Sequence, residues 1–209
     1  MKLAVHNIKG KETKKQINLS KDIFGVEPNN HAIYLDVKQF LASQRSGTHK
    51  TKGRSEVKGS RRKLRKQKGS GAARVGDIKN PLFRGGGRVF GPQPRNYAFK
   101  INKKVKRIAR KSALSHKAKD NCILILEDFN FDKPSTRSYN NFLSNFNLVD
   151  NKTVLVMSET NKNILLSSRN LKNSRVVLAS ELNTYDVMSA SKLMFTESSF
   201  SEIEKIYNS

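Results

Sequence analysis

The side chains best suited to chemistry lie in residues 59–76, which read GSRRKLRKQKGSGAARVG. Lys and Arg crowd this stretch, no acidic residue interrupts it, and its only large aliphatic side chains are Leu64 and Val75. An Arg guanidinium grips two oxygens of one phosphate, and a Lys ammonium adds mobile positive charge. The stretch cannot bury a core, so its residue types predict phosphate binding rather than catalysis.

The excess positive charge of the chain is concentrated around this stretch. The 209 residues carry a formal net charge of +24, and residues 45–119 hold 25 Lys and Arg residues against two acids, Glu56 and Asp77. Such a segment repels itself unless an anion neutralises it, so we expect a polyanionic partner, foremost a nucleic acid. A merely solvated loop is a weaker interpretation. A membrane surface is weaker too, because residues 45–95 have neither an apolar face nor a lipidation signal.

Residues 45–95 also lack any helical or strand period. They contain ten of the twelve glycines and three of the five prolines. We therefore expect a long basic extended loop over 46–95, inserted in a single globular body formed by 1–45 and 96–209. If the loop doubles back, each arm of about 25 residues spans at most about 80 Å. Without a core the free loop should be disordered and become ordered on binding.

Periodic elements flank the loop on both sides. Short apolar runs at 2–8 and 15–20 predict a hairpin, and a helix is expected over 31–44 with Asn30 as its cap. A second helix is expected from the cap Asn102 to Lys119. Its apolar side would carry Val105, Ile108, Ala109, Ser112 or Ala113, and His116, and its opposite side a row of Lys and Arg.

The remainder alternates apolar strands with helices. Strands are expected at 121–127, 153–159, 175–180 and 192–196, with helices within 135–147, 162–171, 185–190 and 199–207. This alternation predicts an α/β fold, a three-layer body in which helices flank a mostly parallel sheet.

An α/β sheet invites an enzyme hypothesis, which the residues do not favour. No glycine-rich phosphate loop follows a strand, and the four histidines are scattered without metal-ligand spacing. The acids Glu127, Asp128 and Asp132 are better explained as helix caps and turn residues. Catalytic residues, metal and cofactor are therefore expected to be absent. An enzyme acting on nucleic acid, with the loop as a clamp, would need an acid or metal cluster near the strand ends.

The apolar runs and the single cysteine predict where the chain is located and its disulfide state. No run of about 18 apolar residues predicts a transmembrane helix, and the start MKLAVHNIKGKETKK does not read as a secretion signal. The single Cys122, inside CILILE, excludes an internal disulfide and is expected to pack in the core. The chain is expected to be cytoplasmic.

Four stretches together resemble the bacterial form of the large-subunit ribosomal protein four family. They are GTHKTKGRSEVKG (47–59), RKQKGSGAARVG (65–76), PLFRGGGRVFGPQPRNYAFKINKKVKRIARKSALS (81–115) and ILLSSRNL (164–171). The resemblance runs in order through essentially the whole chain, and its middle block is the most specific part.

The resemblance implies a structural constituent of the large ribosomal subunit. The body would sit on the outside of the subunit, and the loop would thread between rRNA helices to the wall of the peptide exit tunnel. The protein would bind large-subunit rRNA early in assembly. There its tip would form a constriction with large-subunit protein twenty-two, past which the nascent peptide moves. Some family members also repress their own operon, so a messenger RNA is a second expected target. The chain would be ribosome-bound.

The predicted tip departs from the family pattern. The family commonly has proline and tryptophan where Leu64 and Arg65 stand here, and an arginine where Ala72 stands. The tip therefore has a freer backbone and lacks a stacking ring, so the family's tunnel-wall packing and macrolide effects are not carried over to it. The candidate tip residues are Arg62, Lys63, Leu64, Arg65, Lys66 and Gln67.

The candidate rRNA-binding residues are the polar and basic side chains of the loop together with the cationic side of the second helix. Aromatic residues are few in the segment (Phe83, Phe90, Tyr97, Phe99), so base stacking is expected to be secondary. The set is Arg45, Thr48, His49, Lys50, Lys52, Arg54, Lys58, Arg61, Arg62, Lys63, Arg65, Lys66, Lys68, Arg74, Lys79, Arg84, Arg88, Arg95, Lys103, Lys104, Lys106, Arg107, Arg110 and Lys111.

Overall fold

A computed structural model describes residues 2–208, with side chains through Tyr207. The chain divides into two compact units. One contains the sheet and is formed by the described residues up to Leu41 and from Lys100 onward. The other, Ala42–Phe99, is called the basic hairpin below.

The first unit is built on a six-stranded sheet with the order β2-β1-β3-β6-β4-β5. β1 (Lys2–His6) and β2 (Glu12–Asn18) form the predicted hairpin, and their pairing is antiparallel. All other pairings are parallel, among β1, β3 (Ile123–Leu126), β6 (Lys192–Thr196), β4 (Thr153–Met157) and β5 (Ser174–Leu178). The predicted mostly parallel α/β sheet is confirmed.

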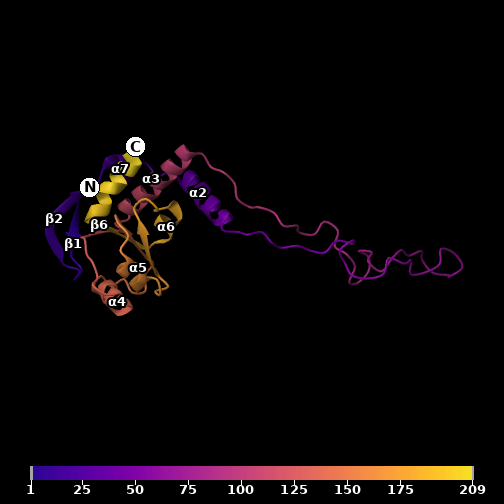
Figure 1. The fold of residues 1–209 in the computed structure, drawn as a ribbon. Helices are drawn as coiled ribbons and strands as arrows, with labels where there is room; N and C mark the ends of the chain where they lie inside the picture. Colours follow the sequence, from indigo (N-terminus) through magenta and orange to yellow (C-terminus); the bar gives the residue numbers. More distant parts are fainter. Residues whose placement is uncertain (1, 209) are drawn as a thin grey trace. The chain divides into compact units, whose positions relative to one another are not determined.

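Helices cover both faces of this sheet (Figure 1). On one face lie α4 (Thr136–Asn145) and α5 (Lys162–Ser168), which contact each other. On the other lie α1 (Lys21–Phe24), α3 (Lys103–Lys119), α6 (Thr184–Ser189) and α7 (Glu197–Asn208), and α2 (Asn30–Ser43) packs beside them. The sequence predicted each of these helices except α1, whose four residues are too few to show a period.

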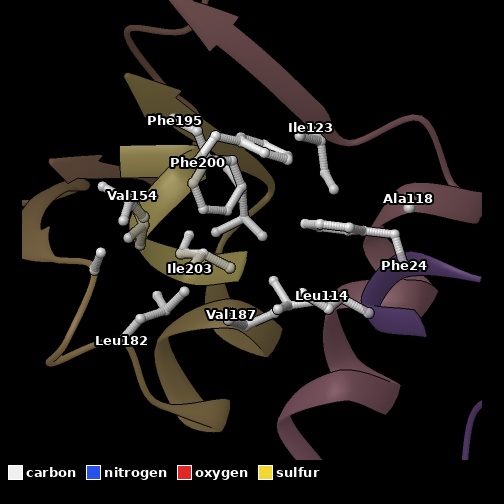
Figure 2. Packing of buried hydrophobic residues seen from close by; sticks show 14 of the residues in the cluster. Phe24, Leu114, Ala118, Ile123, Val154, Leu182, Val187, Phe195, Phe200 and Ile203 are labelled. Atoms are coloured by element: carbon white, nitrogen blue, oxygen red, sulfur yellow. The ribbon is translucent and has the colours of Figure 1, made fainter. Parts of the chain in front are cut away.

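Alternate strand residues feed two separate cores. Ile123, Ile125, Leu193 and Phe195 point to the α3–α6–α7 side, where Figure 2 shows Phe195, Phe200, Ile203 and Leu114 converging. Their neighbours Leu126, Leu155 and Met194 belong to the core under α4 and α5. Because side chains alternate across a strand, fully apolar strands such as ILIL require helices on both faces.

Several local predictions were wrong. The N-cap residue of α2 is Asn29, whose Oδ1 accepts a hydrogen bond from the Ala32 amide. The N-cap therefore lies one residue before the predicted Asn30. Asn102 is the predicted N-cap residue of α3, and its carbonyl accepts the first intrahelical hydrogen bond from Lys106, but its side chain makes no cap hydrogen bond. Ile108, placed on the apolar side of α3, is 48% exposed.

Cys122 is also misplaced by the sequence. It precedes β3 rather than belonging to it, it is only half-buried, and its thiol donates to the Asp120 carbonyl at 3.4 Å. Among the described residues, none of the helices has the length and apolar character to cross a membrane.

Candidate nucleic-acid interface

The basic hairpin is a segment that turns back along itself without forming regular strands (Figure 1). Backbone hydrogen bonds tie its two arms together at intervals. The Arg95 amide donates to Gly47 O at 3.1 Å, Thr51 to Pro92 O at 3.1 Å, Arg88 to Lys52 O at 3.0 Å, and Leu64 to Gly76 O at 3.0 Å. These pairs place the apex of the hairpin between residues 65 and 75, so the predicted tip residues 62–67 lie at the end of one arm and the start of the apex.

Glycines permit the two arms to approach this closely. At Gly47, φ is +62° and an added Cβ would lie 2.1 Å from the Arg95 carbonyl oxygen. At Gly87 an added Cβ would lie 2.3 Å from the Arg54 amide nitrogen. A side chain at either position would separate the arms, which is one physical reason for the glycine content of this segment.

Tyr97 organises the base of the hairpin. Two guanidinium groups lie over its ring, with the Arg45 Cζ atom 4.0 Å and the Arg95 Cζ atom 4.6 Å from the ring centroid. Its hydroxyl is 3.0 Å from His49 Nε2. Cation–π contacts at exposed sites contribute about 0.5–1 kcal/mol each. Three candidate RNA-binding residues are therefore gathered around one aromatic ring that the sequence did not single out.

The two acidic residues of the hairpin are bound by its own cations. Glu56 accepts from the Lys50 ammonium and the Gly53 amide, and these hydrogen bonds lower the pKa of its carboxyl, with the Lys50 contribution the larger. Asp77 is buried and accepts from Arg54 Nη2 at 2.9 Å. Neither carboxylate is left to repel an incoming phosphate.

Cations line a hollow near the apex. Its volume is about 810 Å³, and its walls include Val57, Leu64 and Ile78. Its basic lining side chains are Lys58, Arg62, Lys63, Arg65, Lys66, Lys79 and Arg84. Lys79 is 7% exposed and its backbone carbonyl accepts from Gly87, so it is part of the framework of the hairpin. The hollow can accommodate anionic groups such as phosphates.

The other loop candidates are exposed along the arms and apex. Thr48, Lys52, Arg61, Lys68, Arg74 and Arg88 all have exposed side chains. The Lys63 ammonium bonds the Gln67 side chain four residues on, so two of the predicted tip residues contact each other. Leu64 is about half exposed beside the hollow.

A second cationic surface lies on α3, in the sheet-containing unit. Lys103, Lys104 and Arg107 are exposed, while Lys106, Arg110 and Lys111 are half-buried. Lys106 Nζ donates to Gln39 Oε1 of α2 at 3.3 Å. Arg110 interacts with the Tyr207 hydroxyl of α7; burial raises the pKa of that phenol and the guanidinium moderates the rise. Lys103, Lys106, Arg107 and Arg110 share a shallow hollow of about 260 Å³ with Ile206 and Tyr207.

One of the three strand-end acids, Asp128, acts as the sequence predicted. Asp128 follows β3, and its Oδ1 accepts from the amide and the hydroxyl of Ser198, in the first turn of α7, at 3.2 and 2.7 Å. It therefore caps a helix. In the chain from residue 2 to 208, no three His, Cys, Asp or Glu side chains are grouped so that they could hold a metal ion.

Comparisons with known proteins agree with this geometry. The profile of the ribosomal protein L4/L1 family matches residues 17–206. The chain is 55% identical to the large ribosomal subunit protein uL4 of Christiangramia forsetii, over 98% of each chain. It is 55% identical to that of Phocaeicola vulgatus over 99% of each, and 56% identical to that of Parabacteroides distasonis over 98% of each.

The same comparisons decide between the hypotheses of a binding protein and an enzyme. The matched family is not enzymatic, so the prediction that this chain is no enzyme is confirmed. The match extends over both units described above, from β2 to α7, and includes the whole basic hairpin. This chain therefore belongs to the ribosomal protein L4/L1 family.

Proposed function

We propose that this chain is a structural constituent of the large ribosomal subunit that binds large-subunit rRNA through the basic hairpin and the cationic side of α3. Both arms of the hairpin present Lys and Arg side chains, and both of its acids are neutralised from within. This internal neutralisation is the observation that carries the proposal. Because both acids of this surface are already paired, its remaining cations have no internal partner of opposite charge and can bind an external polyanion.

In this proposal the hairpin acts as an insertion into folded RNA. Its apex reaches the wall of the peptide exit tunnel, where the nascent peptide and large-subunit protein twenty-two are its neighbours. Binding occurs early in subunit assembly, and the chain is ribosome-bound in the cytoplasm. The relatives' name, large ribosomal subunit protein, supports this placement, as does the resemblance of the middle of the chain to the tunnel-lining family.

Charge neutralisation near the apex tests the RNA contact. Glutamine is substituted at Arg61, Arg62, Lys63, Arg65, Lys66 and Lys68, which are all exposed. Each lost phosphate contact changes the slope of log affinity against log salt by about 0.7–0.9, so six lost contacts flatten it by about 4–5. The binding partner is protein-free large-subunit rRNA, titrated at several salt concentrations.

A matched control removes the same charge elsewhere. Glutamine at six exposed lysines of the sheet-containing unit, Lys9, Lys11, Lys14, Lys21, Lys133 and Lys152, should leave the slope close to that of the wild type. Equal slopes in both variants would mean that net charge alone attracts the RNA and that the apex makes no phosphate contacts.

Photocrosslinking from position 65 in cells tests the location. Crosslinks to large-subunit rRNA near the exit tunnel support the proposal. Crosslinks spread over messenger RNAs, without ribosomal enrichment, would leave an RNA-binding hairpin but refute the ribosomal assignment.

A further inference from the structure

Phe90 is the most exposed large apolar side chain in the described structure. Its relative exposure is 103%, whereas Phe83 in the same arm is 36% exposed and Tyr97 makes cation–π contacts with two arginines. Phe90 also has φ +53°, in the left-handed region. A bulky residue rarely adopts that backbone conformation, and such outliers persist where the surroundings impose them for a function.

The backbone around Phe90 is held from both sides. Two residues before it, the Arg88 amide donates to Lys52 O at 3.0 Å, and two residues after it, Pro92 O accepts from Thr51 at 3.1 Å. Gly91 packs so closely that an added Cβ would lie 1.8 Å from Thr51 Oγ1. Both flanks are thus fixed to the opposite arm, and Phe90 itself has no ring or cation–π contact among the described residues. The ring is presented outward on a constrained turn.

The surroundings of this ring favour one kind of partner. Phe90 belongs to an arm that also exposes Arg84, Arg88 and Arg95, within a segment whose two acids are already bound by cations. An apolar protein partner would have to bury the arginine side chains that flank the Phe90 ring. RNA instead supplies phosphates for these cations and a flat π-face for the ring. Aromatic rings interleaved with Lys and Arg are the usual arrangement for stacking unpaired bases.

We propose that Phe90 stacks on an unpaired nucleobase of the bound RNA, with Arg84 and Arg88 contacting phosphates beside it. The inference rests on the proposed function and deepens it, because it adds a base contact to a surface otherwise built for phosphates. It is compatible with the sequence-based expectation that base stacking is secondary, since it assigns stacking to one ring.

A substitution at Phe90 can distinguish the contribution of the ring from that of the backbone turn. Asn adopts left-handed φ more readily than other residues with a side chain, so Phe90→Asn removes the ring and keeps the turn. The control is Leu82→Asn, which removes a side chain that is 88% exposed in the same arm but has no π-face. Binding is measured against protein-free large-subunit rRNA of Christiangramia forsetii, whose protein is 55% identical to this chain.

Loss of one stacked base should weaken binding of the Phe90→Asn variant by about 5- to 140-fold. Its salt dependence should remain that of the wild type, since phosphate contacts are unchanged. The Leu82→Asn variant should bind within about twofold of the wild type.

A fluorescence measurement reports the stacking directly. The chain contains no Trp, so Phe90→Trp introduces a single indole, and Leu82→Trp provides the matched control. Stacking on a base quenches indole emission, so we expect strong quenching by rRNA at position 90 and little at position 82. Quenching at 90 together with the affinity loss in Phe90→Asn supports the proposal.

Wild-type affinity in Phe90→Asn, or equal quenching at positions 82 and 90, overturns it while rRNA binding by the hairpin stands. Emission at 90 that is unchanged by rRNA, and that shifts to the blue only when other ribosomal proteins are added, also overturns it and identifies a protein contact. Absence of rRNA binding by the wild-type chain would instead refute the proposed function itself.

Discussion

Replacing Gly47 by alanine should open the base of the basic hairpin and leave the sheet-containing unit folded. Gly47 has φ +62°, where an L-residue costs about 1–2 kcal/mol. Its new Cβ would lie 2.1 Å from the Arg95 carbonyl oxygen and 3.0 Å from the Tyr97 ring. Backbone must move to relieve that approach, which removes the hydrogen bond from the Arg95 amide to Gly47 O, worth about 1 kcal/mol.

The two costs together give about 2–3 kcal/mol of local destabilisation, or roughly 30- to 140-fold more frequent opening. Hydrogen exchange of the Arg95 amide measures this opening because that amide is the donor across the base. The melting temperature of the sheet-containing unit should not change, since its core residues all lie outside the hairpin.

Gly53→Ala is the matched control. An added Cβ at Gly53 meets nothing within 4 Å, and the Gly53 amide can still donate to Glu56. This variant should exchange at the wild-type rate. The reasoning would be refuted if the Arg95 amide exchanged equally fast in Gly47→Ala and in the wild type. It would also be refuted if that amide showed no protection in the wild type, because the free hairpin would then be disordered, as expected from the sequence alone.

Two further predictions concern the sheet-containing unit. Burial raises the pKa of Tyr139 to about 12, so the folded state resists ionisation of this phenol. The protonated phenol contributes up to about 3 kcal/mol to the free energy of unfolding below pH 10, and this contribution is lost as the pH rises from 10 to 12. In urea unfolding across that range, the Tyr139→Phe variant should not show this decrease in the free energy of unfolding. Asn161 Oδ1 accepts from the amides of Asn163 and Ile164, so Asn161→Ala should cost about 1 kcal/mol in the free energy of unfolding. Asn102→Ala, at a cap position without a side-chain hydrogen bond, should cost less than half of that, and similar losses in both would contradict the assignment.

The sheet and most of its helices were predictable because their burial leaves a periodic trace. Runs such as TVLVM are apolar on both faces, which requires a covered parallel strand. α1 could not be predicted, because the four residues of KDIF cover only about one helical turn and show no repeat of the period. The prediction of the α2 N-cap was wrong for another reason. Asn29 and Asn30 are chemically identical, and only the local backbone decides which of them accepts from the Ala32 amide.

The basic hairpin was predictable in composition and not in structure. Its charge predicted a polyanionic partner. Its cross-arm hydrogen bonds could not be predicted, because they join backbone groups of irregular segments that no pattern of side chains indicates. The contact of Arg45 with the Tyr97 ring joins residues about 50 positions apart and becomes visible only when the arms are paired. The exposed, left-handed Phe90 is likewise a property of conformation and not of residue type.

An insertion of this kind is tolerated in the middle of the chain because of how the sheet is connected. The basic hairpin lies in the connection from β2 to β3, where it begins with the last two residues of α2 and ends before α3. The Lys106 side chain of α3 reaches Gln39 of α2 at 3.3 Å, so the chain leaves and re-enters the sheet-containing unit at neighbouring points. The cost of closing a loop between such points grows only with the logarithm of its length. A long hairpin therefore adds little to the folding cost of the sheet, and both its ends are held by helices, whereas a terminal extension would be held at one end only.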